Sequence, residues 1–165
     1  MGSVEDNLIR KASARIEDDD LDGALRVLDA VLVRDPRNKD ALLDKGAVLQ
    51  NLGHALQSIQ CYDAVLDMAP GCFNALLNKG AALHAEGRYA DAISCYDEIL
   101  GDGKPSPLAL LYKGLSLGEL GRFEDAIRHF DDALLLDGDL ELARLSRGAA
   151  ERLLNNGDDG RQDLV

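Results

Sequence analysis

Residues 73–106 read FNALLNKGAALHAEGRYADAISCYDEILGDGKPS, and their pattern recurs upstream and downstream at a fixed spacing of 34 residues. We call a set of positions related by this spacing a column. Three columns show the period most clearly: Gly46, Gly80, Gly114 and Gly148; Gly53, Gly87 and Gly121; and Asp29, Asp63, Asp97 and Asp131. A strict period of this length predicts a fold of stacked structural repeats.

Each repeat contains two helical patterns, as residues 39–72 illustrate. Apolar residues recur at helical spacing on both sides of Gly53-His54, and Pro70 ends the second pattern. Two helices of ~12–14 residues joined by so short a turn pack antiparallel. Each repeat is therefore predicted to be a helical hairpin.

Glycine in the middle of the first helix needs a physical reason, because it costs ~1 kcal/mol relative to alanine. We predict that Gly46 and its equivalents let the second helix approach closely. The second helix offers one column of small residues and one column of bulky residues. These columns are Ala24, Ser58, Ala92 and Ala126, and Leu28, Tyr62, Tyr96 and Phe130.

This arrangement resembles the tetratricopeptide repeat family, whose unit has a small residue in the first helix, a glycine-aromatic turn, and alanine and an aromatic in the second helix. The third repeat matches with Gly80, Gly87-Arg88-Tyr89, Ala92 and Tyr96. The family's early aromatic is replaced here by Leu42, Leu76 and Leu110, and Ser58 replaces the usual alanine. The resemblance covers roughly residues 5–155. It implies an all-α fold, a right-handed α-α superhelix (solenoid).

The resemblance also implies a single domain over residues 1–155. Its parts are repeats at 5–38, 39–72, 73–106 and 107–140, a capping helix at 141–155, and a flexible acidic tail at 156–165. In the capping helix, Arg144 and Glu151 replace the apolar residues that pack on a repeat's own second helix. The residues expected to dock this helix on the preceding repeat are Leu142, Leu145, Ala149 and Leu153.

Residues 101–107, GDGKPSP, depart from the pattern. Gly101 and Gly103 are expected to end their helix about one turn early, and Ser106-Pro107 suits an N-cap followed by proline. The period continues past this segment, so we expect the stack to continue with a looser joint. The segment is not a phosphate loop, because such a loop requires glycine where Glu98 stands.

Composition argues against binding to nucleic acid or spanning a membrane. The formal net charge is -12, with 30 acidic against 18 basic residues, so the chain repels phosphate backbones. No run approaches the ~18 apolar residues of a membrane span, and the N-terminus lacks the pattern of a secretory signal. We therefore expect a cytoplasmic protein with a protein or peptide partner, and no nucleic-acid or membrane partner.

Motifs for metal binding and catalysis are weak. The three cysteines have no CxxC spacing, which indicates neither zinc nor a disulfide framework. The segment from Asp18 to Asp29 nearly fits a calcium loop, but Asp29 stands where a bidentate glutamate is needed. The repeat register accounts for the same residues more economically. No nucleophile–base pair can be built around His54, His84 or His129, so we expect no cofactor, no metal and no enzymatic activity.

The first helices are predicted to line a concave groove, as in the proteins that this chain resembles. At ~100° per residue, the positions after the core column point toward that groove. They are Leu43, Ala47, Gln50, Asn74, Leu77, Ala81, His84, Leu108, Leu111, Leu115 and Leu145. An exposed apolar lane of this kind favours binding. Alternatively, Leu43, Leu77 and Leu111 are buried between adjacent first helices, and the sequence leaves both interpretations open.

The resemblance implies a protein-interaction scaffold that binds a peptide or amphipathic helix in the groove. The alternative is self-association into a homo-oligomer through the groove or the repeat ends. Some family members clamp the carboxylate terminus of heat-shock chaperones, but only Asn78 matches that clamp, so we predict no such binding.

A last periodic feature sets Lys45, Lys79, Lys113 and Arg147 against the aspartate column. It predicts either a solvated surface ladder, worth ~0–1 kcal/mol per pair, or inter-helix ion pairs that fix the stacking register.

Overall fold

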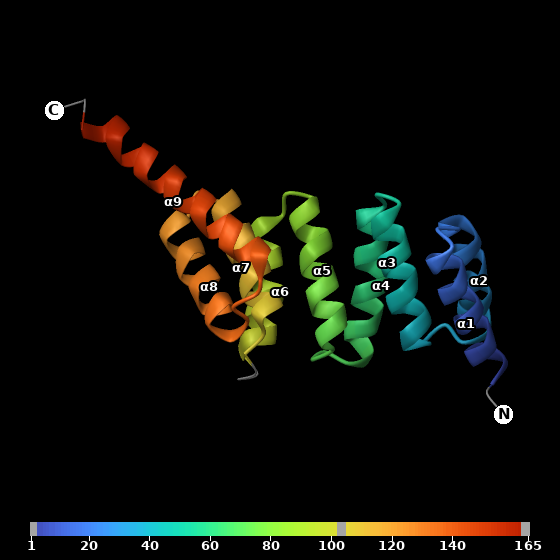
Figure 1. The fold of residues 1–165 in the computed structure, drawn as a ribbon. Helices are drawn as coiled ribbons and strands as arrows, with labels where there is room; N and C mark the ends of the chain where they lie inside the picture. Colours follow the sequence, from blue (N-terminus) through green and yellow to red (C-terminus); the bar gives the residue numbers. More distant parts are fainter. Residues whose placement is uncertain (1–2, 102–104, 163–165) are drawn as a thin grey trace. The chain divides into compact units, whose positions relative to one another are not determined.

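Every regular element in the described residues, 3–101 and 105–162 of the computed structural model, is an α-helix (Figure 1). The all-α fold predicted from the sequence is confirmed. The chain divides into two compact units, unit 1 (Met1–Glu86) and unit 2 (Gly87–Val165). In stacked repeats each repeat contacts only its neighbours, so a division can fall at a turn, here inside the third predicted repeat.

Unit 1 holds α1 (Val4–Glu17), α2 (Leu21–Arg34), α3 (Lys39–Asn51), α4 (Ala55–Met68) and α5 (Phe73–Ala85). Unit 2 holds α6 (Tyr89–Gly101), α7 (Pro107–Glu119), α8 (Phe123–Leu136) and α9 (Glu141–Gln162). Within the units, α1 packs on α2, α3 on α4, and α7 on α8, and α9 packs on α8. These are the helical hairpins predicted for the first, second and fourth repeats.

The mid-helix glycines sit where a ring of the second helix meets the first. A Cβ atom on Gly46 would lie 2.5 Å from Cε1 of Tyr62, and one on Gly114 would lie 2.6 Å from Cε1 of Phe130. Both distances are shorter than any van der Waals contact. The predicted close approach is confirmed at these two positions.

Local signals end and start the helices as the sequence predicts. The turn column adopts the left-handed conformation, with φ of 79° at Gly53 and 71° at Gly121, and of 59° where Asp19 occupies the column. Ser106 caps α7 by accepting a hydrogen bond from the Ala109 amide at 3.2 Å, with proline following it. The predicted early end of the preceding helix lies partly outside the described residues, since α6 reaches Gly101 and residues 102–104 are not described.

The docking of the capping helix was predicted wrongly. Leu142, Leu145 and Leu153 are at least half exposed, and the buried contacts of α9 are made by Ala143 and Ala150. Small side chains lie there because they let α9 approach the core of unit 2, whose buried residues include Phe130 and Ala133.

The end of α9 also differs from the prediction. The helix continues to Gln162, so residues 156–162 of the predicted flexible tail are helical, and residues 163–165 lie outside the described part. No proline follows residue 107 to stop the helix, and a glycine within it costs only ~1 kcal/mol.

Candidate interaction site

The predicted groove residues of unit 1 lie on two first helices, α3 and α5, which contact each other. All of them are half-buried except Asn74, which is exposed. The residues on α3 are Leu43, Ala47 and Gln50, and those on α5 are Asn74, Leu77, Ala81 and His84. We call this surface the α3–α5 face. Its leucines are neither fully exposed nor removed from solvent, so the two interpretations of this column are both partly right in unit 1.

A buried tyrosine from α4 connects the two helices of this face. Tyr62 is fully buried, and its hydroxyl donates to Oε1 of Gln50 at 3.3 Å and is hydrogen-bonded to the Asn78 side chain. Burial raises the pKa of the Tyr62 hydroxyl, so it stays protonated. The sequence analysis placed Tyr62 only in the column of bulky residues on the second helix. The signal that was missed is that a buried tyrosine hydroxyl needs a partner.

Asp44 lies on α3 at the position that Asn78 occupies on α5, 34 residues later. The residue equivalent to Tyr62 below it is Leu28, which is buried and has no hydroxyl to donate. Burial, and then the charge of Asp40, raise the pKa of the Asp44 carboxyl above its usual range. The face therefore carries a half-buried carboxylate whose charge is poorly compensated. The sequence analysis did not single out Asp44.

The predicted groove residues of unit 2 have different environments. Leu108 is exposed on α7, whereas Leu111 is only 2% exposed and belongs to the core. In this unit the buried interpretation of the leucine column is correct, since Leu111 is buried in a core cluster that includes Ala143 and Ala150 of α9. Leu145, the last member of the column, is 62% exposed on α9.

A small apolar groove of about 180 Å³ lies between α7, α8 and α9. Leu115 is one of its lining residues, together with the rings of Phe123 and Phe130 and with Ala149 and Leu153 of α9. Leu115 is therefore the predicted residue of unit 2 that lies in a hollow.

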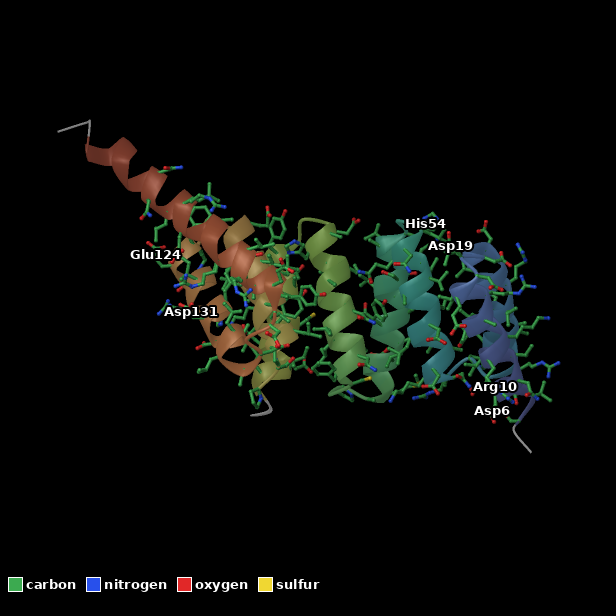
Figure 2. The ribbon with its side chains drawn as sticks, in the orientation of Figure 1. Asp6, Arg10, Asp19, His54, Glu124 and Asp131 are labelled. Carbon is green, nitrogen blue, oxygen red and sulfur yellow. The ribbon has the colours of Figure 1, made fainter. Side chains whose placement is uncertain are left out.

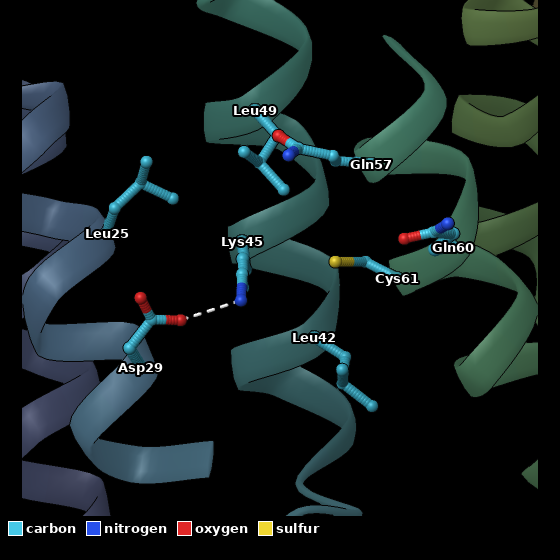
Figure 3. A pocket seen from close by; sticks show the side chains of 8 residues that line it. All are labelled: Leu25, Asp29, Leu42, Lys45, Leu49, Gln57, Gln60 and Cys61. Atoms are coloured by element: carbon cyan, nitrogen blue, oxygen red, sulfur yellow. Dashed lines mark hydrogen bonds and ion pairs between the residues drawn. The ribbon is translucent and has the colours of Figure 1, made fainter. Parts of the chain in front are cut away.

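The lysine and arginine column pairs with the aspartate column between neighbouring helices. Lys45 binds Asp29 at 2.6 Å in a polar hollow of about 410 Å³ between α2, α3 and α4 (Figure 3). The equivalent pairs are Lys79 with Asp63 at 2.5 Å, Lys113 with Asp97 at 2.6 Å, and Arg147 with Asp131. Each pair joins the first helix of one repeat to the second helix of the repeat before it. Inter-helix ion pairs are confirmed, and their effect on the register stays a prediction.

One column next to these pairs holds cysteine in the second and third repeats, Cys61 and Cys95, and histidine in the fourth, His129. Cys61 lines the hollow of unit 1, and burial raises the pKa of its thiol, which keeps it a poor nucleophile. The equivalent residue of the fourth repeat, in unit 2, is His129, half-buried near Lys113 and Asp97. Burial, and then the charge of Lys113, lower the pKa of the imidazole.

The acidic segment that nearly fits a calcium loop has structural roles. Asp20 caps α2 by accepting a hydrogen bond from the Gly23 amide at 2.9 Å, which lowers the pKa of its carboxyl, and it also binds Arg15. Asp19 and His54 lie in the turns of the first two hairpins (Figure 2). Among the described residues, no three His, Cys, Asp or Glu side chains gather closely enough to hold a metal ion.

Helical hairpins repeated at a 34-residue period define a helical-repeat protein. Residues 43–107 match the tetratricopeptide repeat family. The resemblance to that family is confirmed, since this segment carries its repeat and the fold agrees over nearly the whole chain. Repeats of this family generally mediate protein–protein interaction. No curated protein sequence matches the chain.

Three solved structures illustrate the agreement. MamA from Desulfovibrio magneticus RS-1 has a TM-score of 0.76 at 20% identity, covering 99% of this chain and 98% of that one. A tetratricopeptide repeat protein from Parabacteroides merdae gives 0.83 at 22% identity, covering 98% and 64%. PilW, described as a widely conserved type IV pilus biogenesis factor, gives 0.81 at 21% identity, covering 92% and 72%. At these identities the likeness establishes the fold alone.

In the described part of the chain, no helix is both long and apolar enough to cross a membrane.

Proposed function

We propose that this chain is a non-enzymatic protein-interaction module that binds a basic amphipathic helix on the α3–α5 face. The observation that carries the proposal is the pair Leu43 and Leu77, which stay partly exposed on adjacent first helices around a polar bridge from Tyr62. Partly exposed apolar side chains of this kind supply the affinity of a helix-in-groove complex.

Polar groups on the same face supply orientation. The buried Tyr62 hydroxyl is hydrogen-bonded to the side chains of Gln50 and Asn78. Each amide has two donor hydrogens and an acceptor oxygen, so groups remain on both for a partner's polar side chains. Because Tyr62 fixes them before binding, little side-chain entropy is lost on contact.

Charge favours a basic partner over an acidic one. Burial disfavours the ionised form of the Asp44 carboxylate, and a lysine or arginine from a partner would compensate its charge. The net charge of -12 also attracts basic segments over a longer range.

Leu111 of unit 2 is buried and is no longer a proposed contact residue. The exposure of Leu108 keeps it a prediction of the sequence, separate from the α3–α5 face. The cytoplasmic location expected from the sequence stays a prediction.

The test uses a synthetic amphipathic helical peptide with leucines on one face and lysines on the other. We expect saturable binding by fluorescence anisotropy, and at least about tenfold weaker binding after Leu43→Gln with Leu77→Gln. Leu56→Gln is the matched control, since Leu56 lies on α4 of the same unit and is 61% exposed.

A second arm tests the charge. Asp44→Asn should weaken binding of the lysine peptide but not of a version with glutamine in place of lysine. Unchanged affinity of the Leu43/Leu77 double variant, with circular dichroism showing intact helices, would exclude the α3–α5 face.

A further inference from the structure

α9 carries an apolar stripe that no described element of unit 2 covers. Its leucines are 50%, 62% and 53% exposed, although α9 is packed on α8 through its alanines. At ~100° per residue, the stripe falls within about 80° of the helix surface. Its members are Leu142, Leu145, Ala149 and Leu153.

Gly148 lies beside this stripe and has open space above it. In the same column, Gly46 and Gly114 are covered by aromatic rings. A Cβ atom on Gly148 would meet only Nη1 of Arg152, at 3.8 Å. A second helix could therefore approach the backbone of α9 closely at this point.

We propose that this face of α9 binds α9 of a second copy of the chain in an antiparallel pair. The pattern is self-complementary about a point near Gly148. In the antiparallel arrangement, Leu142 of each copy lies opposite Leu153 of the other, and Leu145 lies opposite Ala149. A two-fold interface uses every such contact twice.

The charges beside the stripe favour the same arrangement. Glu141 and Arg152 are both exposed, and in the antiparallel pair each lies near the opposite charge of the other copy. A parallel pair would place Glu141 against Glu141 and Arg152 against Arg152. Opposed like charges suppress the wrong orientation of an interface.

The groove between α7, α8 and α9 gives one leucine of the second copy a place to bind. Leu153 is among the lining residues of this groove, next to Phe123. Leu142 of the second copy, lying opposite Leu153, would enter the groove beside Leu115. This interface lies on unit 2 and goes beyond peptide binding by the α3–α5 face of unit 1.

The test is the molar mass of the full chain, measured by light scattering after size exclusion over a hundredfold range of concentration. We expect a concentration-dependent dimer, and at least about a tenfold larger dissociation constant for Leu145→Glu. Leu135→Glu is the matched control, since Leu135 is 85% exposed on α8 away from the stripe, and its dimer should be unchanged. A monomer at every concentration overturns the proposal, as does a dimer that Leu145→Glu leaves intact.

Charge reversal tests the orientation. Glu141→Arg alone and Arg152→Glu alone should each weaken the dimer, and the double reversal should restore it. A double reversal as weak as the single variants overturns the antiparallel pairing. If the protein is monomeric and Leu145→Glu instead weakens peptide binding, the face belongs to the peptide. Leu43→Gln with Leu77→Gln should leave the dimer unchanged, which separates this proposal from the proposed function.

Discussion

The second repeat in unit 1 and the fourth repeat in unit 2 pack alike in their interiors but differ in the exposed face of the first helix. Both place a glycine of the first helix under an aromatic ring, Gly46 under Tyr62 and Gly114 under Phe130. Their first-helix faces differ, because Leu43 stays half-exposed and its equivalent Leu111 is buried. The 34-residue period thus specifies how a hairpin packs, but equivalent first-helix side chains are not equally available for binding.

The largest effect should come from shortening that leucine in each unit. Leu111→Ala leaves a cavity in the core of unit 2 and should cost ~2–4 kcal/mol, whereas Leu43→Ala should cost about 1 kcal/mol or less because its site is open to solvent. Urea unfolding followed by circular dichroism measures both. Equal losses in the two variants would contradict the difference in burial.

A smaller effect should come from the glycine column. Gly114→Ala places a Cβ atom 2.6 Å from the Phe130 ring, and overpacking of this kind costs ~1–3 kcal/mol. Gly118→Ala, in the same helix, meets nothing within 4 Å and should stabilise by up to ~1 kcal/mol through helix propensity. Opposite shifts of the unfolding midpoint are expected. A destabilising Gly118→Ala would mean that helix propensity does not decide its sign.

The fold could be predicted from the sequence because its signals are local and periodic. Each of these signals can be recognised within a few residues of sequence, as for the turn glycines, the Ser106 cap and the helical spacing of apolar residues. The docking of α9 was missed because hydrophobicity ranks Leu142 above Ala143, while close packing of helices favours the smaller side chain.

The candidate site was less predictable because it depends on neighbours in space. Leu111 is buried in a core cluster whose members come from α7, α8 and α9, up to 39 residues later in the chain. The hydrogen bonds of Tyr62 depend on which polar residues of two other helices meet its hydroxyl. Neither the burial of Leu111 nor the partners of Tyr62 can be predicted from one column of the repeat alone.

The inter-helix ion pairs recur at successive joints between repeats, and their contribution to stability can be measured. Asp97→Asn removes the partner of Lys113 and should cost ~0–1 kcal/mol, since Asp97 is half exposed. A double-mutant cycle with Lys113→Met measures the coupling by urea unfolding. Zero coupling would show that the ladder is a surface feature without a role in register.

The change from Cys61 to His129 should make unit 2 the acid-sensitive one. The pKa of His129 in the folded chain is below its ordinary value because of burial. Above that ordinary value the imidazole is neutral in both the folded and the unfolded chain. As the pH falls through about 6.5, the unfolded chain binds a proton first, so the free energy of unfolding decreases. The loss should be below about 1 kcal/mol, because the side chain is partly open to solvent.

The control for this prediction is His129→Cys, which restores the residue of the equivalent column. Urea midpoints of the two proteins, compared between about pH 7.5 and pH 5, isolate the imidazole from the carboxylates. Parallel pH profiles would contradict the assignment.

Asp44 should show the smallest effect on stability and the opposite pH dependence. Its pKa is raised by burial, so the ionised carboxylate destabilises the fold above the ordinary value of about 3.9. Asp44→Asn should therefore stabilise by a few tenths of a kcal/mol near neutral pH, after allowance for solvent screening. The gain should fade as the pH drops below about 4, where wild-type Asp44 is protonated in both states.

A functional carboxylate should show this gain together with weaker binding of the lysine peptide. The equivalent variant Asn78→Asp supplies the contrast in the same unit, because it places a carboxylate beside the Tyr62 hydroxyl, which can donate a hydrogen bond to it. If Asp44→Asn instead lowers stability near neutral pH, the carboxylate has a partner within the fold. In that case it is already compensated, and it does not favour binding of a basic helix on the α3–α5 face.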